Sequence, residues 1–511
     1  MKVFWSIACV TFLILAGAAV WMGGLNQDEG WYLYAANLVA RGEVPYRDFF
    51  YTQGPLMPIV YSAFTWIWRE WGLLGARIFT LLIGTAGLVF AIALARRLAP
   101  DGRRGTAGLV AFLLLGGNLY HLYFQAIPKT YALAGFLVIV GFYLLSIVAV
   151  RGRWALAALA GLALAFAAGT RISLGMLLVV GGLWLLGTSR WKPLIAFSIG
   201  GFFGLGIVYG PFLIDAGARE GLFAAQAYHA ARGGFDPVWT IGSFSRLVRW
   251  YLPTFVTLGL WLLTSRAKGE NVRPSSFAFV TLAGFLVVFT VQMFAPFPYE
   301  DYQVPIMGLL TVVAAAGFAS LGGVPHPHGA LQAPSAPSCP SNLSNPSSLS
   351  GFLPLLVLGM VLASSFGSPL LEEWSTNGKD RFWSLKKEAY ELPQLREVAR
   401  RIEALDPGGT ELLTQDLYLA IETGRTVPKG LEMGPFSILT DDEWRRLLGF
   451  AKSPIAAMSG YAFAIEPPKC NERPLERQLE YWGILKRNYE FVERVDAFGQ
   501  NSTPLLILRR K

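Results

Sequence analysis

Charged residues are scarce in this sequence: Asp, Glu, Lys and Arg make up 15% of its 511 residues, whereas hydrophobic residues make up 53%. A typical soluble domain has about 25% charged residues, so this composition excludes an ordinary soluble enzyme and favours an integral membrane protein. The sequence also lacks a visible internal repeat. This absence argues against a secondary transporter, because such proteins are commonly built from repeats.

Long apolar runs are what the sequence has in abundance. A membrane span needs about 20 largely apolar residues, and this criterion predicts a mostly α, polytopic membrane protein with about eleven transmembrane helices. The predicted spans are 3–22, 76–95, 106–122, 130–150, 154–169, 172–187, 194–213, 251–264, 277–294, 304–321 and 352–363.

The formal net charge of +9 comes largely from basic clusters in short connections between spans. When the spans are threaded in order, these connections fall on the side of the N-terminus, and basic loops mark the cytoplasmic side. The sequence therefore predicts a multi-pass cell-membrane protein with a cytoplasmic N-terminus and an extracytoplasmic active site, and gives no support for nucleic-acid binding. The clusters contain Arg96, Arg97, Arg103, Arg104, Arg151, Arg153, Arg190, Lys192, Arg266, Lys268 and Arg273.

The first apolar run has two interpretations. Lys2 and the small residues AGAA flank it as in a cleaved signal peptide, but its long core and the many later spans favour a retained helix. Under this topology Cys9 lies in a span, Cys339 inside and Cys470 outside, so no two of the three cysteines can form a disulfide.

Polar segments divide the chain into four parts. The part at 322–350 is rich in Pro, Ser and Asn, cannot bury apolar area and is predicted to be a disordered cytoplasmic linker; His326 and His328 within it lack a third metal ligand and are interpreted as incidental. The parts are the transmembrane region 1–321 with a structured outer loop at 24–75, the linker 322–350, the last transmembrane helix 351–366 and an extracytoplasmic α/β domain 367–511.

The C-terminal domain has a mixed pattern. Apolar spacing predicts helices over 392–405, 416–424 and 473–489, and strands over 410–415, 489–498 and 504–510, the last two forming a closing pair. The domain has no Gly-rich phosphate loop and no Cys/His set with metal-ligand spacing. Its sequence therefore indicates no chemistry of its own.

Two adjacent carboxylates, Asp28 and Glu29, directly follow the first span. They begin a predicted helix capped by Asn26 or Asp28, and Pro55 begins a second, apolar one. One face of the first helix suits the membrane interface; it consists of Trp31, Tyr34, Ala35 and Leu38. The carboxylates are either an N-cap with a first-turn acid or, since desolvation and a like charge both raise proton affinity, a general base.

The N-terminal hundred residues resemble the GT-C glycosyltransferases of the protein O-mannosyltransferase and lipid A aminoarabinose transferase type. Those enzymes have an Asp-Glu pair after the first span, a Tyr-x-x-Ala helix, a Gly-x-x-x-Pro/Tyr segment, a Pro-Leu motif and an Arg that opens the next span. The matching residues here are Asp28, Glu29, Tyr32, Ala35, Gly42, Pro45, Tyr46, Pro55, Leu56 and Arg77.

The resemblance implies an inverting enzyme that takes a sugar from a polyprenyl-phosphate carrier and transfers it to a lipid, glycan or protein acceptor on the outer face of the membrane. Asp28 would be the base that deprotonates the acceptor, Glu29 would orient Asp28 or bind the acceptor, and cations would stabilise the departing phosphate. The aminoarabinose transferases have a Lys before their Pro-Pro-Leu, whereas this chain has Gln53 and Gly54. The phosphate-binding cation must therefore come from elsewhere.

Several residues of the predicted outer side are candidates for substrate binding. Arg171, at the outer end of a span, is the first choice for the phosphate; Lys129 and Arg232, with His229 beside it, are further ones, and snorkelling or interfacial anchoring is the alternative reading for these cations. Asp48 would contact the acceptor or a divalent cation, the one possible cofactor. Glu300 and Asp301 are interpreted as acids of a solvated loop.

The sequence thus predicts an integral-membrane glycosyltransferase with a polyprenyl-phosphate sugar donor. The alternatives are a polytopic secondary transporter, which the position of the charges at the outer edge disfavours, and a non-catalytic scaffold of the same fold, which Gln53 keeps open.

Overall fold

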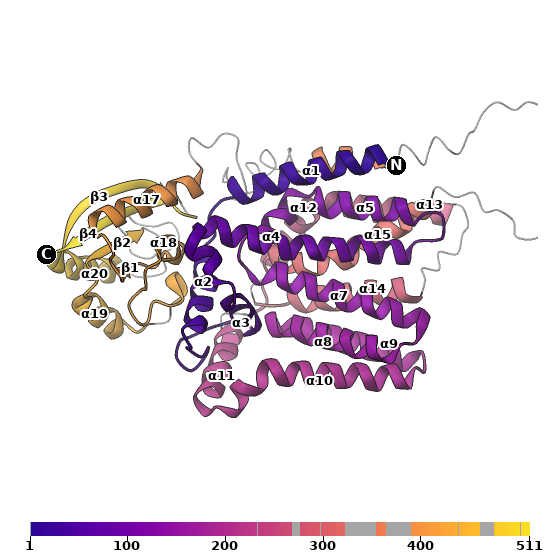
Figure 1. The fold of residues 1–511 in the computed structure, drawn as a ribbon, viewed down its shortest axis with the longest axis horizontal. Helices are drawn as coiled ribbons and strands as arrows, with labels where there is room; N and C mark the ends of the chain where they lie inside the picture. Colours follow the sequence, from indigo (N-terminus) through magenta and orange to yellow (C-terminus); the bar gives the residue numbers. More distant parts are fainter. Residues whose placement is uncertain are drawn as a thin grey trace, which may run out of the picture.

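The chain forms a bundle of long helices with a small mixed domain at one end, next to helix α2 (Figure 1). The structure is a computed structural model that describes residues 2–231, 234–267, 276–296, 298–321, 354–363, 390–437, 439–459, 475–500 and 502–511. The predicted linker 322–350, with Cys339 and its two histidines, lies outside the described residues, as does Cys470.

Apolar helices make up the bundle. Six of them are long and apolar enough to cross a membrane, and two bent helix pairs raise the number to eight if each pair is one span. The six are α1 (Lys2–Trp21), α4 (Thr65–Leu98), α7 (Thr130–Arg151), α10 (Trp191–Ile214), α14 (Ser276–Met293) and α15 (Val304–Ser320), which the 3₁₀ turn η2 (Glu300–Gln303) precedes.

The bent pairs are α5 (Arg104–Gly116) with α6 (Leu119–Ala126), and α12 (Pro237–Trp250) with α13 (Leu252–Ala267). Three shorter apolar helices are α8 (Trp154–Thr170), α9 (Met176–Gly187) after the turn η1 (Ile172–Gly175), and Pro354–Ala363. Each of the eleven predicted runs therefore falls on a helix, and the polytopic, mostly α class is confirmed.

Glycines bring neighbouring helices of the bundle close together. A Cβ atom at Gly161 of α8 would collide with the Phe197 carbonyl of α10, and one at Gly200 of α10 would collide with the Ala158 carbonyl. Small residues allow this close approach, which in a membrane replaces the hydrophobic effect as the source of helix association.

The segment between α1 and the membrane part of α4 is structured, as predicted, but the expected interfacial face of its first helix is buried. It contains α2 (Gln27–Ala40) and α3 (Leu56–Ser62) and ends at the first turns of α4. Trp31, Tyr34, Ala35 and Leu38 are all buried, because α2 packs against α3 on one side and the C-terminal domain on another. The prediction that this face of α2 lies in the membrane interface is therefore wrong.

The C-terminal domain is an α/β domain, as predicted. Its four-stranded sheet has the order β1-β2-β4-β3, with β1 parallel to β2 and the other pairs antiparallel. The sequence did not indicate α19 and β2. The elements are α17 (Glu391–Leu405), β1 (Leu412–Leu413), α18 (Leu417–Thr423), the turn η3 (Gly434–Phe436), α19 (Asp441–Phe450), β2 (Ile455–Ser459), α20 (Leu475–Asn488), β3 (Tyr489–Phe498) and β4 (Thr503–Arg510).

Candidate active site

The N-terminus of α2 presents the two adjacent carboxylates. Asn26 is the N-cap: its side chain accepts a hydrogen bond from the Asp28 amide, and the Glu29 carboxylate accepts one from the Asn26 amide, which completes a capping box. Asp28 and Glu29 both lie in the first turn, where the helix dipole favours negative charge. Of the two predicted caps, Asn26 is the one the structure uses.

Glu29 faces the interior of the protein. Its two carboxylate oxygens lie 2.6 and 2.7 Å from the guanidinium nitrogens of Arg77 on α4, and neither side chain is exposed. The same guanidinium donates to the carbonyls of Val20, Gly23 and Gly24. Glu29 is thus committed to a buried ion pair and is not accessible from solvent.

Asp28 faces a second charged group. Its carboxylate lies 2.7 Å from the Lys129 ammonium, which in turn lies 2.8 Å from the Asp301 carboxylate. The Trp31 indole donates a hydrogen bond of 3.0 Å to Asp28, and the Tyr131 hydroxyl donates one of 2.9 Å to Asp301. Lys129 therefore bridges two carboxylates that are 273 positions apart in the sequence.

Burial differs within this charged group. The Lys129 side chain is 7% exposed, whereas Asp28 retains 22% exposure. Burial alone lowers the pKa of Lys129, but the facing carboxylates of Asp28 and Asp301 outweigh it and hold the pKa well above its ordinary value. Lys129 is a permanent cation here, and the readings of Lys129 as a surface anchor and of Asp301 as a solvated-loop acid are wrong.

Arg171 lies close to two tyrosine rings and forms no ion pair with an acid among the described residues. Its guanidinium carbon is 5.0 Å from the Tyr131 ring centre and 4.5 Å from that of Tyr302, and the Lys129 ammonium is 4.6 Å from the Tyr131 ring. One Arg171 nitrogen donates to the Thr130 hydroxyl at 3.4 Å, and the buried Nε has no hydrogen-bond partner in the described part of the chain. Aromatic rings therefore hold this cation with hydrogen-bonding capacity to spare.

The loop of Gln53 reaches the same region. A Cβ atom at Gly54 would collide with the carbonyl of Gly169, two residues before Arg171, so only glycine permits this approach. The Gln53 carbonyl accepts a hydrogen bond from the Tyr46 hydroxyl. Gln53 thus lies beside the turn that carries Arg171, and it contributes a neutral side chain where the aminoarabinose transferases have a cation.

Tyr32 is a further member of this group. It lies on α2 one turn after Asp28, is fully buried, and is close enough to Asp28, Arg171 and Lys129 to sense their charges. Burial raises its pKa far above the ordinary value, so the phenol is neutral. It offers a hydroxyl and an aromatic face but no proton-accepting group at physiological pH.

The other predicted site residues lie apart or outside the described structure. Asp48 pairs with Arg47 at 2.9 Å and accepts from the Val44 amide, and these contacts lower its pKa to about 2; none of them involves the Lys129 group. Glu300 is paired with Arg246 at 3.2 Å, so it is not a solvated-loop acid. Arg232 lies outside the described residues, and His229 is placed only as a residue of α11 (Ala216–Ala231).

No group of three His, Cys, Asp or Glu side chains suited to a metal ion occurs among the described residues. Asp28 and Asp301 both face Lys129, whose ammonium group already lies between their carboxylates. The residues of this group therefore do not form a divalent-cation site in this arrangement.

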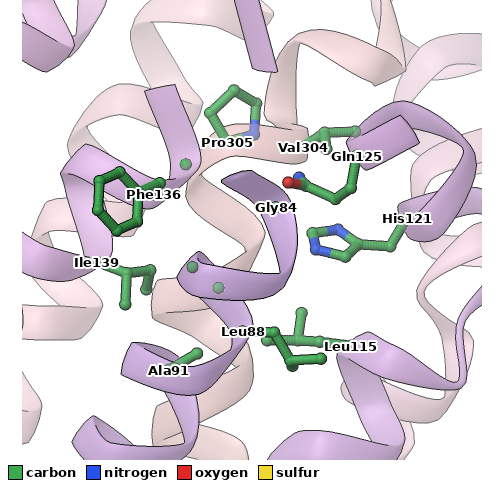
Figure 2. A pocket seen from close by; sticks show the side chains of 13 residues that line it. Gly84, Leu88, Ala91, Leu115, His121, Gln125, Phe136, Ile139, Val304 and Pro305 are labelled. Atoms are coloured by element: carbon green, nitrogen blue, oxygen red, sulfur yellow. The ribbon is translucent and has the colours of Figure 1, made fainter. Parts of the chain in front are cut away.

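A small cavity of about 20 Å³ lies between α4, α5, α6, α7 and α15 (Figure 2). Its polar lining residues are His121 and Gln125, and its other walls are glycine and apolar side chains such as Gly87, Gly135 and Phe136. A cavity of this size holds about one water molecule.

Sequence reasoning missed how these residues come together. Asp301 was recognised as an outer acid, but the tyrosines on either side of Arg171, Tyr131 and Tyr302, carry no motif that separates them from ordinary interfacial aromatics. Gln303, fully buried with neither amide atom hydrogen-bonded within the described residues, was also missed. The only feature of the sequence that could have indicated Tyr131, Tyr302 and Gln303 is that each lies within two positions of Lys129 or Asp301.

No protein-family model matches the chain, and no curated protein matches it in sequence. Among solved structures, the fold is similar to that of ArnT from Cupriavidus metallidurans, both bound to undecaprenyl phosphate (TM-score 0.59) and in the apo state (TM-score 0.60). In each case the identity is 14% over 99% of this chain and 97% of ArnT. An oligosaccharyltransferase from Archaeoglobus fulgidus has a TM-score of 0.49 at 10% identity, over 95% of this chain and 72% of its own, which is too weak a likeness to argue from. The chain thus has a polytopic fold similar to that of ArnT over 99% of its length, in agreement with the resemblance that the N-terminal motifs indicated.

Proposed function

We propose that this protein is an inverting glycosyltransferase that moves a sugar from a polyprenyl-phosphate carrier to an acceptor at the extracytoplasmic membrane surface. One observation carries the proposal: a partly exposed carboxylate, Asp28, pairs with the buried cation Lys129, and a second buried cation, Arg171, lies near the same Tyr131 ring as Lys129. A reaction that takes a proton from an acceptor and releases a lipid phosphate needs a base and cations in close proximity.

Asp28 is the base in this proposal. The acceptor hydroxyl gives its proton to the Asp28 carboxylate while its oxygen attacks the anomeric carbon, and the bond from that carbon to the phosphate oxygen breaks with inversion. The electron pair of this bond leaves on the lipid phosphate. Because Asp28 keeps 22% of its side chain exposed, an acceptor can reach it, which the fully buried Glu29 does not allow.

Arg171 and Lys129 are the proposed phosphate-binding cations. Arg171 forms no ion pair in the part of the chain that the structure describes, where its contacts are tyrosine rings and a threonine hydroxyl. Lys129 is shared between Asp28 and Asp301, so a phosphate that attracts the ammonium weakens its contact with Asp28. Donor binding would thereby free the base for the acceptor.

The fold comparison supports a polyprenyl-phosphate donor, because one of the ArnT structures contains undecaprenyl phosphate. The proposal does not specify the acceptor, nor whether the transferred sugar is a hexose or a pentose.

The test is sugar release by purified protein in lipid nanodiscs from a panel of short-chain polyprenyl-phosphate sugars. Wild type is compared with Asp28→Asn, with and without EDTA. We expect a loss of roughly 100- to 10,000-fold in the variant, the usual contribution of a general base, and no effect of EDTA. Equal activity of both proteins would overturn the role of Asp28, and solute flux without a donor would favour a transporter.

A further inference from the structure

Helix α4 is broken at Gly72, where the chain leaves the outer segment and enters the bundle. Gly72 has φ +60° and ψ −154°, a conformation that L side chains rarely adopt, so the helix effectively restarts at Leu73. The first amide groups of a helix lack partners within it and need an acceptor from elsewhere. The preceding residue usually supplies that acceptor from its side chain, but Gly72 has none.

The missing cap comes from the C-terminal domain. The carboxylate of Glu422, on α18, accepts a hydrogen bond of 2.7 Å from the Leu73 amide. A Cβ atom on Gly72 would collide with this carboxylate, so the glycine and the acid fit each other. A negative charge at the start of a helix is also favoured by the helix dipole.

Arg396 of α17 fixes this cap from the other side. Its guanidinium lies 3.2 Å from the Glu422 carboxylate and donates to the Trp71 carbonyl at 3.2 Å. The C-terminal domain therefore binds the last carbonyl before the break and the first amide after it. These two bonds flank the break that separates the two parts of α4.

One helical turn after Leu73 lies Arg77, whose guanidinium uses all five of its N–H groups. Two reach Glu29 and three reach the carbonyls of Val20, Gly23 and Gly24. Such a fully occupied guanidinium tolerates little displacement. The position of the Leu73–Arg77 turn consequently fixes Glu29, and with it the first turn of α2 that carries Asp28.

We infer that Glu422 is a positioning residue for Asp28, and that the C-terminal domain acts on the active site by holding the start of the membrane part of α4. This inference rests on the proposed function for its catalytic consequence. The domain supports the same turn of α2 directly as well: the Gln27 side chain donates to Asp416 at 2.9 Å, and the Gln27 amide donates to the Gln500 side chain at 2.7 Å.

The test uses the full-length protein in nanodiscs. Glu422→Ala removes the cap, Glu422→Gln keeps an acceptor oxygen for the Leu73 amide, and Glu397→Ala is the matched control because Glu397 forms only surface pairs with arginines of α17. We expect Glu422→Ala to lower kcat about 10- to 100-fold with little change in KM for the donor, as for a small misplacement of a catalytic group. Glu422→Gln and Glu397→Ala should stay within about threefold of wild type by the same reasoning.

A second readout does not depend on activity. The Trp31 indole donates to Asp28, so in protein labelled with 5-fluorotryptophan the ¹⁹F resonance of Trp31, assigned with Trp31→Phe, reports on the surroundings of the Asp28 carboxylate. We expect this resonance to shift in Glu422→Ala and to remain in place in Glu422→Gln. Amide hydrogen exchange at 73–77 should become faster in Glu422→Ala only.

The outcomes separate the two claims. An inactive wild type whose Trp31 resonance still responds to Glu422→Ala would remove the proposed function and retain the positioning role. An unchanged Trp31 resonance, or an unchanged kcat in a variant with faster exchange at 73–77, would overturn the positioning role. If Glu422→Ala does not fold, Arg396→Ala, which weakens the hold on Glu422 but leaves the cap in place, decides by the same measurements.

Discussion

Arg77 and Glu29 form an ion pair with no exposure to solvent, although they lie 48 positions apart and in two different helices. Removing one partner of such a pair leaves an uncompensated buried charge, which typically costs about 3–5 kcal/mol. We therefore expect Arg77→Ala and Glu29→Ala to lower the thermal unfolding temperature markedly in nanodiscs. Arg77→Lys should also do so, since an ammonium cannot replace five N–H donors in a planar arrangement.

Arg104→Ala is the control for these variants. Arg104 pairs with Asp101 at the surface, where both side chains are more than half exposed, and such pairs contribute roughly 0–1 kcal/mol. If Arg104→Ala and Glu29→Ala shifted the unfolding temperature equally, the structural importance of the Arg77–Glu29 pair would be refuted.

The raised pKa of Lys129 has a consequence for the pH profile. A lysine whose pKa is higher in the folded protein than in the unfolded chain, where it is about 10.4, stabilises the fold below that pH. This contribution is lost only as the pH rises through the still higher folded value. Lys129 should thus remain charged throughout the usual assay range.

The measurement is the pH dependence of kcat/KM in wild type and in Lys129→Arg, which keeps a cation at every pH. We expect the two profiles to have the same shape up to about pH 10. A fall in the wild-type profile below that pH, absent in Lys129→Arg, would show that Lys129 loses its proton there and contradict the prediction.

Arg171 should matter for donor affinity. A charge-assisted hydrogen bond contributes about 1.5–3 kcal/mol, so Arg171→Ala is expected to raise KM for the donor by roughly 10- to 150-fold. Arg171→Lys should recover only part of the loss, because a lysine ammonium does not stack between the rings of Tyr131 and Tyr302 as a planar guanidinium does.

Binding of a sugar-free polyprenyl phosphate provides the check, with Arg153→Ala as the control. Arg153 is exposed at the connection between α7 and α8, at the opposite end of the bundle from Arg171. Equal affinity of Arg171→Ala and Arg153→Ala for this lipid would exclude Arg171 from the phosphate site.

Much of this structure could be predicted from the sequence because its signals are local. Apolar runs locate the helices of the bundle, and the Asp-Glu pair with its asparagine cap locates the start of α2. The order of motifs near the N-terminus indicates the fold. In each case neighbouring residues in the chain decide the result, so no knowledge of tertiary contacts is needed.

The active-site geometry could not be predicted in this way. Whether Lys129 is an interfacial anchor or a buried bridge depends on Asp301, which arrives from a segment 172 positions away. The same is true of α2, whose aromatic face has the composition of a membrane-surface helix but is covered by the C-terminal domain. Tertiary packing overrides the local pattern at both places.

The close contact at Gly30 bears on how this protein can be re-engineered. A Cβ atom at Gly30 of α2 would collide with the backbone of Tyr418 on α18, and the Val427 amide bonds to the Tyr34 hydroxyl. The helix that carries Asp28 and the domain that covers it are thus fitted to one another at the level of single atoms. A functional chimera between this protein and a relative would have to exchange residues 25–40 together with the C-terminal domain, as one transplantable unit that is discontinuous in sequence.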